Sequence, residues 1–266
     1  RDCRRKWAAD CSLAVWALRP TYVGSRVTEM FGEIGRIGVI VPANNSVLEP
    51  ELGTCLPPGV ALYATRILAK GDLTPAAVIA MEGEVGRAVD ELAATGVDVI
   101  VYADMVTTFI MEDGWNEART SAITADCATP CISAWTALRD ALSALGVKRF
   151  ALGTPYPTAI HDLARPYFEK KGFTVTDDAT LDITAMTEVP KVPPDRLDRL
   201  VRSLDATETE AVVLLATDLP TLASIKALEA ATGLAVLSSN SCLLWSALRT
   251  IGVDAVMSEL GQLIKA

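Results

Sequence analysis

Short runs of aliphatic and β-branched residues recur along the chain, and each run ends on polar residues. Residues 37–41, 97–102, 211–215 and 234–237 follow this pattern. Apolar runs of about four to eight residues, bounded by polar ones, are typical of parallel strands that are buried on both faces. The pattern therefore predicts that these segments are strands of parallel sheets.

Apolar residues at helical spacing lie between these runs. Residues 74–92 begin with Thr-Pro, a capping residue followed by a favoured first helical residue, and Gly96 ends the pattern. Similar patterns occupy residues 135–145 and 194–204. Strands that alternate with helices are typical of right-handed parallel connections. The sequence therefore predicts an α/β fold in which residues 74–92 form one helix.

The whole pattern occurs twice. When the second occurrence is laid over the first, Arg149 falls on Arg36 and Thr217 falls on Asp104. An internal duplication is the simplest explanation. It predicts two pseudo-symmetric Rossmann-like (flavodoxin-like) halves, each a small parallel sheet flanked by helices, with the active site in the cleft between them.

The division of the chain follows from this repeat. We place residues 30–134 together with 235–266 in the first half and residues 135–234 in the second half. Residues 1–29 are rich in arginine, precede the first methionine and have no counterpart in the second half. We expect them to form an extension outside the fold. A signal peptide is disfavoured because Arg-Pro follows the apolar run where small residues would form a cleavage site.

Composition and charge narrow the class of partner. Hydrophobic residues make up 50% of the chain and charged residues 21%, which is typical of a globular protein. The net charge of −9 disfavours nucleic acid or an anionic membrane as a partner. After the N-terminal segment, no apolar run approaches the roughly 18 residues that span a membrane. These features favour a small molecule as the partner.

The cysteines do not predict a metal site. The chain has six cysteines and one histidine, His161, and only Cys127 and Cys131 lie close together in the sequence. No Cys/His cluster with the spacing of a zinc site is present in the sequence. We therefore expect a cytoplasmic protein with reduced thiols, no metal and no cofactor.

The first candidate for chemistry is Asp104, directly after the apolar run 97–102. Ligands of parallel α/β sheets bind beyond the carboxyl ends of the strands. Asp104 is therefore either a functional acid or only the cap of the next helix, since Asp is a favoured N-cap residue.

Three pairs of loops are expected to line the cleft. Polar residues follow corresponding strands in the two halves, and the carboxyl ends of these strands would face each other. The pairs are Asn44, Asn45 and Ser46 with Tyr156; Asp104, Thr107 and Thr108 with Thr217 and Asp218; and Ser133 with Ser238, Ser239 and Asn240.

These loops carry a family resemblance. Val-Pro-Ala-Asn-Asn at 41–45, Glu49, Thr-Pro-Tyr at 154–156 and the segment 216–222 together resemble the aspartate/glutamate racemase superfamily. The chain looks most like the branch that contains maleate cis–trans isomerase and arylmalonate decarboxylase, over residues 34–252.

The resemblance implies two facing cysteines that this chain replaces. In the superfamily, one cysteine from each half acts as acid, base or nucleophile. The first corresponds to Asp104, and the second to Ala216, or to Thr217 if the alignment shifts by one residue. Racemisation by two thiols and isomerisation through a thiol adduct are therefore disfavoured.

The other matching positions suit anion binding. The resemblance implies that Asn45 and Tyr156 hold carboxylate or enolate oxygens. Burial among apolar neighbours would raise the pKa of Asp104. Asp218 is either a second acid or a turn residue. The expected catalytic residues are Asp104, Tyr156 and Asp218, and the expected substrate-binding residues are Asn45, Ser46, Met105, Val106, Thr107, Ala216, Thr217 and Ser133.

Three functions remain open. The first is a cofactor-independent lyase or isomerase, of the decarboxylase or isomerase type, that acts on a small carboxylic or dicarboxylic acid through an enolate-like intermediate. The second is a hydratase or hydrolase in which Asp104 and Asp218 activate water. The third is a carboxylate-binding protein without catalysis. A homodimer or homotetramer is possible under each.

Three other residues have simpler explanations. We expect His161 to be a surface or capping residue and Cys242 to be a buried, unreactive thiol. Glu49 either orients Asn45 or begins a helix.

Overall fold

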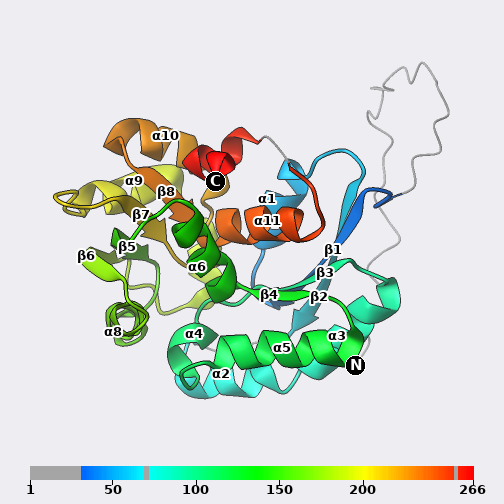
Figure 1. Ribbon diagram of the computed structural model, residues 1–266. Coiled ribbons are helices and arrows are strands. Elements are labelled where there is room, and N and C mark those ends of the chain that lie inside the picture. The colour runs from blue at the N-terminus through cyan, green and yellow to red at the C-terminus, as the bar shows by residue number, and fades with distance from the viewer. Residues whose placement is uncertain (1–30, 69–71, 255–256) are drawn as a thin grey trace, which may run out of the picture.

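The computed structural model describes residues 31–68, 72–254 and 257–266, and the extension expected at 1–29 lies outside them. The chain forms two four-stranded parallel sheets flanked by helices, as the sequence predicted (Figure 1). The strand orders are β2-β1-β3-β4 and β6-β5-β7-β8. The strands are β1 Gly35–Pro42, β2 Val60–Ile67, β3 Val99–Tyr102, β4 Cys131–Ser133, β5 Arg149–Thr154, β6 Thr174–Thr180, β7 Ala211–Leu214 and β8 Ala235–Ser238.

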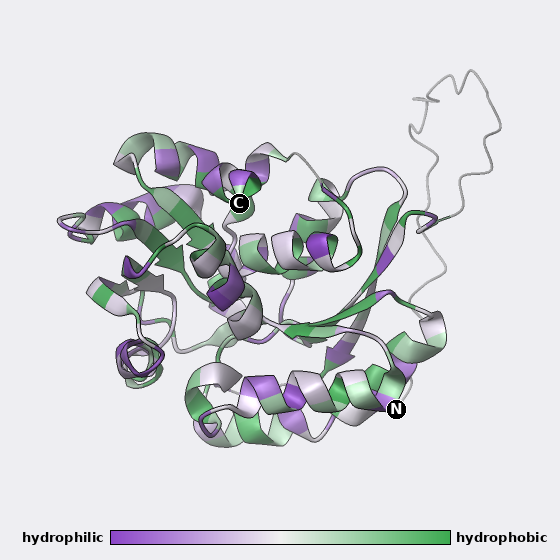
Figure 2. Cartoon of the chain, viewed as in Figure 1, coloured by the Kyte–Doolittle hydropathy of each residue, from purple (hydrophilic) through white to green (hydrophobic). Residues whose placement is uncertain are grey.

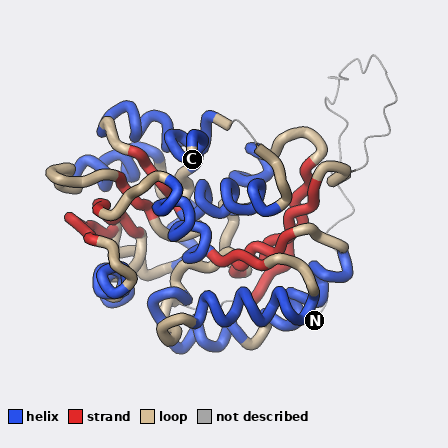
Figure 3. The backbone as a smooth tube through the Cα atoms, in the orientation of Figure 1, coloured by secondary structure: helices blue, strands red, loops and turns tan. Residues whose placement is uncertain are grey.

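The helices surround the sheets, which form two separate groups of strands (Figure 3). None of the helices in the described part of the chain is both long and apolar enough to cross a membrane. The α-helices are α1 Leu48–Cys55, α2 Pro75–Glu82, α3 Val85–Thr95, α4 Thr107–Ile110, α5 Trp115–Cys127, α6 Ala134–Ala144, α7 Thr158–His161, α8 Ala164–Lys170, α9 Pro194–Ser203, α10 Leu222–Thr232 and α11 Ser239–Thr250; the 3-10 helices are η1 Met186–Lys191 and η2 Ser258–Lys265.

The central strands are buried on both faces, which explains their continuous apolar runs. Every residue of β3, β7 and β8 is buried, and these strands are apolar in Figure 2. β3 pairs with β1 (Ile37 with Val99), and β7 pairs with β5 in the same parallel manner. The polar residues that follow β3 and β7 consequently emerge at the carboxyl edge of each sheet.

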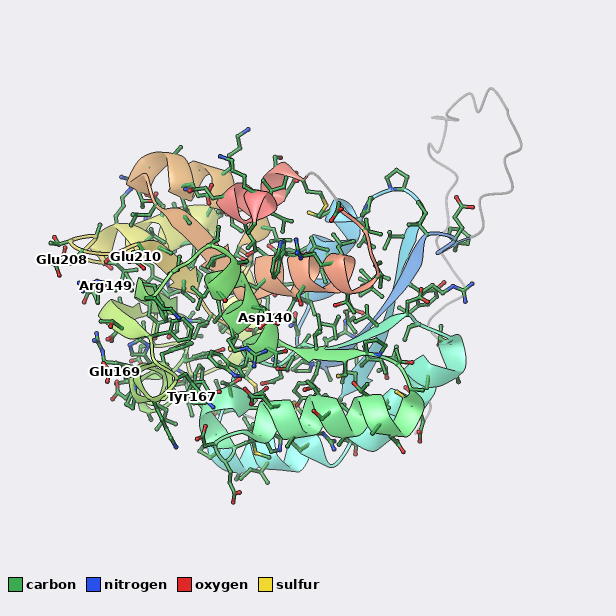
Figure 4. All side chains as sticks on the ribbon, in the orientation of Figure 1. Asp140, Arg149, Tyr167, Glu169, Glu208 and Glu210 are labelled. Atoms are coloured by element: carbon green, nitrogen blue, oxygen red, sulfur yellow. The ribbon has the colours of Figure 1, made fainter. Side chains whose placement is uncertain are left out.

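Equivalent backbone contacts at the start of the central strands support the internal repeat. The Asp98 carboxylate accepts a hydrogen bond from the Arg36 backbone N–H at 2.8 Å. In the second half, the Glu210 carboxylate accepts one from the Arg149 N–H at 2.9 Å. Figure 4 shows Arg149 and Glu210 together at the outer end of the second sheet. Each central pair of strands is thus joined at its start by a carboxylate.

The helix expected over residues 74–92 is interrupted, so that prediction was wrong. α2 ends at Glu82, Gly83 closes it with an N–H bond to the Ala80 carbonyl, and α3 begins at Val85. Glycine has a low helix propensity, and apolar spacing alone did not reveal the break. The interruption lets α3 contact β1 and β2 while α2 contacts α4.

The two halves exchange one helix each. α6 follows β4 of the first sheet, but its Trp135 ring packs against Phe168 and Phe173 of the second half. Conversely, α11 follows β8 of the second sheet and contacts α6, β3 and β4. The boundary predicted before residue 235 moves to Ser238, because β8 pairs with β7 in the second sheet.

Candidate active site

A cavity lies between the carboxyl ends of β3 and β7, with walls from both halves. The cavity opens to solvent, and the empty space in the cavity and its mouth together is about 620 Å³. The lining residues are Pro42, Asn44, Asn45, Leu73, Ala77, Val78, Met81, Asp104, Met105, Val106, Tyr156, Ile183, Met186, Val189, Ala216, Thr217 and Asp218. The cavity therefore combines the predicted polar loops with an apolar wall.

Asp104 is buried in this cavity, two residues after the end of β3. Its side chain is 5% exposed, and its Oδ1 accepts a hydrogen bond from the Thr107 backbone N–H at 2.9 Å. Burial raises the pKa of Asp104 to about 6, although hydrogen bonds from Thr107 and Val106 oppose the rise. Asp104 thus lines the cavity and also accepts the backbone bond expected of a cap.

Asp218 brings a second carboxyl group into the cavity from the loop after β7. Burial raises its pKa to about 7, and the negative charge of Asp104 contributes to the rise. Asp218 receives a hydrogen bond from its own backbone N–H, which opposes the rise. Burial thus raises the pKa of both acids well above the usual range of an aspartate.

Tyr156 supplies a hydroxyl group beside these acids. It is 5% exposed, and its ring lies 6.5 Å from the Phe109 ring in an edge-on arrangement. Burial, together with the charges of Asp218 and Asp104, raises the pKa of Tyr156 well above its usual range. Tyr156 therefore keeps its proton and can donate a hydrogen bond to a ligand oxygen.

Thr217 joins the two halves at the cavity. Its hydroxyl donates to the Ala103 carbonyl at 3.0 Å and accepts from Asn45 Nδ2 at 3.1 Å. Asn45 Oδ1 in turn accepts from the backbone N–H groups of Val47 and Leu48. Both side chains are positioned as predicted, but their polar groups are occupied by the protein itself.

Glu51 forms a second connection between the halves. From α1, its Oε1 accepts hydrogen bonds from the Thr221 and Leu222 N–H groups at 2.7 and 3.0 Å. Its Oε2 accepts from Asn240 Nδ2 at 2.8 Å, and Asn240 also donates to the Thr217 carbonyl at 3.1 Å. Glu51 thus holds the loop that carries Thr217 and Asp218.

The apolar wall was not expected from the sequence. Ala77, Val78 and Met81 come from α2, and Ile183 and Met186 come from the segment between β6 and α9. The helical spacing of Ala77, Val78 and Met81 predicted a buried helix face. Such spacing does not distinguish a helix that packs on the core from one that forms the wall of a cavity. Only the position of α2 over the strand ends reveals their role.

Several expected binding residues do not line the cavity. Ser46 is exposed. The Ser133 hydroxyl caps α6 by accepting from the Thr136 N–H, and the equivalent Ser238 caps α11. Thr107 is fully buried and contributes its N–H to Asp104. Where a strand is followed directly by a helix, a Ser hydroxyl can either bind a ligand or cap the helix. At Ser133 and Ser238 it caps the helix.

The remaining candidates lie away from the cavity. The expectation of a surface His161 was wrong: it is buried, with Nδ1 2.9 Å from Thr154 Oγ1 and Nε2 2.8 Å from Asp178 Oδ1. Cys242 is fully buried in α11, as expected, and burial raises its pKa to about 12. Glu49 lies in the first turn of α1 and pairs with an arginine.

No group of three or more potential ligands in the described residues could hold a metal ion. The cavity instead offers two carboxyl groups with different hydrogen-bond support, one phenol and an apolar wall. Such a set can transfer protons to and from carbon or oxygen in a space largely screened from water.

Comparison with known proteins shows the family to which the chain is similar. Residues 37–264 match the family model described as arylmalonate decarboxylase. A maleate isomerase of Nocardia farcinica is 30% identical over 242 residues, which cover 87% of this chain and 96% of that protein.

Two solved structures share the fold. A variant of the maleate isomerase Iso from Pseudomonas putida S16, with maleate, has a TM-score of 0.82 at 28% identity and covers 86% of this chain and 97% of its own. A mutant of the Nocardia farcinica maleate cis–trans isomerase carries a covalently bound succinylcysteine intermediate. Its TM-score is 0.81 at 30% identity, with 86% of this chain and 98% of that chain covered.

Proposed function

The chain belongs to the arylmalonate decarboxylase family, and from this premise we propose that it is a cofactor-independent lyase or isomerase of a small carboxylic acid. Its reaction passes through an enolate-like intermediate, and Asp104 and Asp218 transfer the protons. The observation that carries the proposal is the presence of two carboxyl groups with raised pKa in one cavity.

Hydrogen bonding assigns different roles to the two acids. Two backbone N–H groups stabilise the ionised form of Asp104, whereas Asp218 has only its own N–H and faces the charge of Asp104. We therefore assign the base to Asp104, whose carboxylate accepts the backbone N–H bonds, and the acid to Asp218, which faces the charge of Asp104. A base and an acid with pKa values near the working pH are suited to proton transfer.

The reaction follows from these roles. In an isomerisation, Asp104 removes a proton from the carbon next to the substrate carboxyl or carbonyl group, and Asp218 delivers a proton to carbon. In a decarboxylation, the bond to the leaving carboxylate breaks, carbon dioxide departs and the electron pair enters the enolate, which Asp218 then protonates. Tyr156 donates a hydrogen bond to the enolate oxygen in both cases.

A thiol-free route distinguishes this proposal from the succinylcysteine intermediate seen in a relative. In the described part of the chain, the lining of the cavity includes no cysteine. The family resemblance implies that Asp104 replaces the first thiol and that Ala216, or Thr217 if the alignment shifts by one residue, replaces the second. Proton transfer between carboxyl groups therefore replaces addition of a thiol to the substrate.

Deuterium incorporation tests the proposal. Malonates, unsaturated acids and 2-substituted acids are incubated with the enzyme in heavy water and followed by NMR. We expect deuterium at carbon in at least one compound, and loss of that signal in Asp104→Asn and Asp218→Asn. Uptake of oxygen-18 from labelled water without deuterium at the substrate carbon would instead indicate a hydratase or hydrolase and overturn the proposal.

A further inference from the structure

Two backbone donors that could hold a ligand carboxylate are already occupied at the end of β3. The Thr107 N–H donates to Asp104 Oδ1 at 2.9 Å, and the Val106 N–H also bonds to this carboxyl group. A carboxylate ligand needs such donors, because charge-assisted bonds from N–H groups offset its loss of hydration. Asp104 therefore occupies with its own carboxylate two of the donors that a ligand anion would use.

The second loop and the Asn45 loop offer few free donors. The Asp218 N–H bonds to its own carboxyl group. The Asn45 amide donates to Thr217 and accepts from two backbone N–H groups. Among the side chains of the described lining, the Tyr156 hydroxyl and the Asn44 amide N–H groups remain as donors, and both are neutral. Acceptors are plentiful, since Asn44 Oδ1 is buried without a hydrogen-bond partner and both acids have free oxygen atoms.

The charges that line the cavity also disfavour an anionic ligand. The residues that line the cavity in the described ranges include two aspartates but no lysine, arginine or histidine. Arg66, near the Asn45 loop, donates to the Ala43 and Asn45 carbonyls and pairs with Glu49. Within the described lining, a dianion would therefore face carboxylates without a compensating positive charge. Each like-charge contact at close range weakens binding by about tenfold or more at an effective protein dielectric constant.

We infer that the cavity accepts compounds with at most one carboxylate, together with an O–H or N–H donor and an apolar substituent, and that it rejects dicarboxylates. Asp104 takes the position of one substrate carboxylate. The donor groups of the ligand would meet Asp104, Asp218 and Asn44, and the apolar substituent would lie against α2 and η1. This inference rests on the proposed function for the identity of the site and adds its substrate class.

A matched series of ligands tests the inference directly. Maleate and the cis isomers of crotonate and crotonamide share a cis-unsaturated four-carbon chain and carry two, one and no carboxylates. Their binding to the full chain is measured by isothermal titration calorimetry at pH 8, where both aspartates are largely ionised. We expect maleate to bind at least about tenfold more weakly than crotonate and crotonamide. Maleate binding as tightly as either of them, or more tightly, would overturn the inference.

Two variants test whether maleate is rejected because Asp104 occupies hydrogen-bond donors or only because Asp104 is negatively charged. Asp104→Ala and Asp218→Asn each remove one negative charge, but only Asp104→Ala releases the Thr107 N–H. We expect maleate to gain about 100-fold in affinity in Asp104→Ala and about tenfold in Asp218→Asn. Equal gains would show that Asp104 acts only as a charge and would contradict its role as a carboxylate substitute.

Controls show whether a variant is folded and whether a result contradicts this inference or the proposed function. Asp104→Asn retains the volume of the side chain. It replaces Asp104→Ala if thermal unfolding shows that the alanine variant is not folded. The affinity of Asp104→Asn for maleate must then be at least about tenfold higher than that of the wild type. Binding does not require turnover, so deuterium exchange is scored separately. If deuterium exchanges into a monocarboxylate and maleate also binds tightly, the inference is overturned but the proposed function is not. If crotonamide binds more tightly than maleate but no compound exchanges deuterium, the proposed function is overturned and the inference about the ligand class is supported.

Discussion

The loops that follow β3 and β7 occupy equivalent places in the two halves but hold their acids differently. Asp104 sits in a turn whose own N–H groups bond to its carboxylate. Asp218 follows Ala216, whose φ of +86° is unusual for a residue with a side chain, and receives only its own N–H. Burial raises the pKa of both carboxyl groups, to about 6 and about 7, but their hydrogen-bond support differs.

The two loops also differ in what fixes their conformation. The first loop is held by bonds within itself, between Asp104 and Thr107. The second loop is held from outside, because Thr217 bonds to Ala103 and Asn240, and Asn240 bonds to Glu51 of the first half. The geometry of the second acid therefore depends on how the halves dock, whereas the first acid depends mainly on local sequence.

The largest effect is expected from removing the titrating group of the first loop. Asp104→Asn keeps the size and capping capacity of the side chain, so the fold should change little. Turnover of the substrate found by deuterium exchange should fall by roughly 10² to 10⁴, because a general base is lost. Steady-state kinetics with NMR detection measures this. Wild-type turnover in the variant would transfer the central role to Asp218 and Tyr156.

Breaking the connection between the halves should have the next largest effect. Glu51→Ala removes the acceptor of three hydrogen bonds and leaves the Thr221 and Leu222 N–H groups without a partner. We expect a loss of about 2–3 kcal/mol in the free energy of unfolding by urea titration. Glu49→Ala is the matched control on the same helix, because its exposed pair with Arg66 contributes at most about 1 kcal/mol. Equal losses would show that the bridge does not stabilise the second loop.

A pH titration of stability sharpens the comparison between the acids. A raised pKa means that the folded state holds the proton more tightly than the unfolded chain. Its stabilisation is therefore complete below about pH 4 and is lost as the pH rises through about 6 to 7. Glu82, whose burial also raises its pKa to about 7, contributes in the same direction.

The free energy of unfolding should accordingly fall between pH 4.5 and pH 7.5, by up to about 1.4 kcal/mol per pH unit for each group. Asp218→Asn should make this fall shallower, and the exposed control Asp140→Asn should not. Urea titrations across the pH range measure both slopes. An unchanged slope in Asp218→Asn would mean that Asp218 does not hold its proton in the folded state.

The smallest effect concerns the backbone of the second loop. Ala216→Gly should stabilise the protein by up to about 1 kcal/mol, because glycine adopts positive φ without strain, although its greater freedom in the unfolded chain offsets part of the gain. Ala128→Gly, at a φ of +56° on the end of α5, is the control outside the cavity. Both should raise the melting temperature, and only Ala216→Gly should alter turnover. A fall in melting temperature for Ala216→Gly would remove backbone strain as a feature of this loop.

Local sequence was sufficient for the strands and for the polar loops that follow them. A run such as 211–215 is both apolar and bounded by polar residues, and burial on both faces of a parallel sheet produces that pattern directly. The duplication then placed the strand ends opposite each other. The lining of one cavity accordingly includes Asn45, Asp104, Tyr156 and Asp218, as the sequence suggested.

The sequence could not determine how these groups are used, because that depends on partners far apart in the chain. Glu51 meets Asn240 and the start of α10, and Thr217 meets Ala103, only after the halves dock. The same is true of the apolar wall, since a helix face that covers a cavity has the spacing of one that covers a core. Whether an N–H, an amide or a carboxylate is free for a ligand is a property of the completed hydrogen-bond network. Residue type and local spacing therefore determined which groups gather at the strand ends, while tertiary structure alone decided which of them remain available.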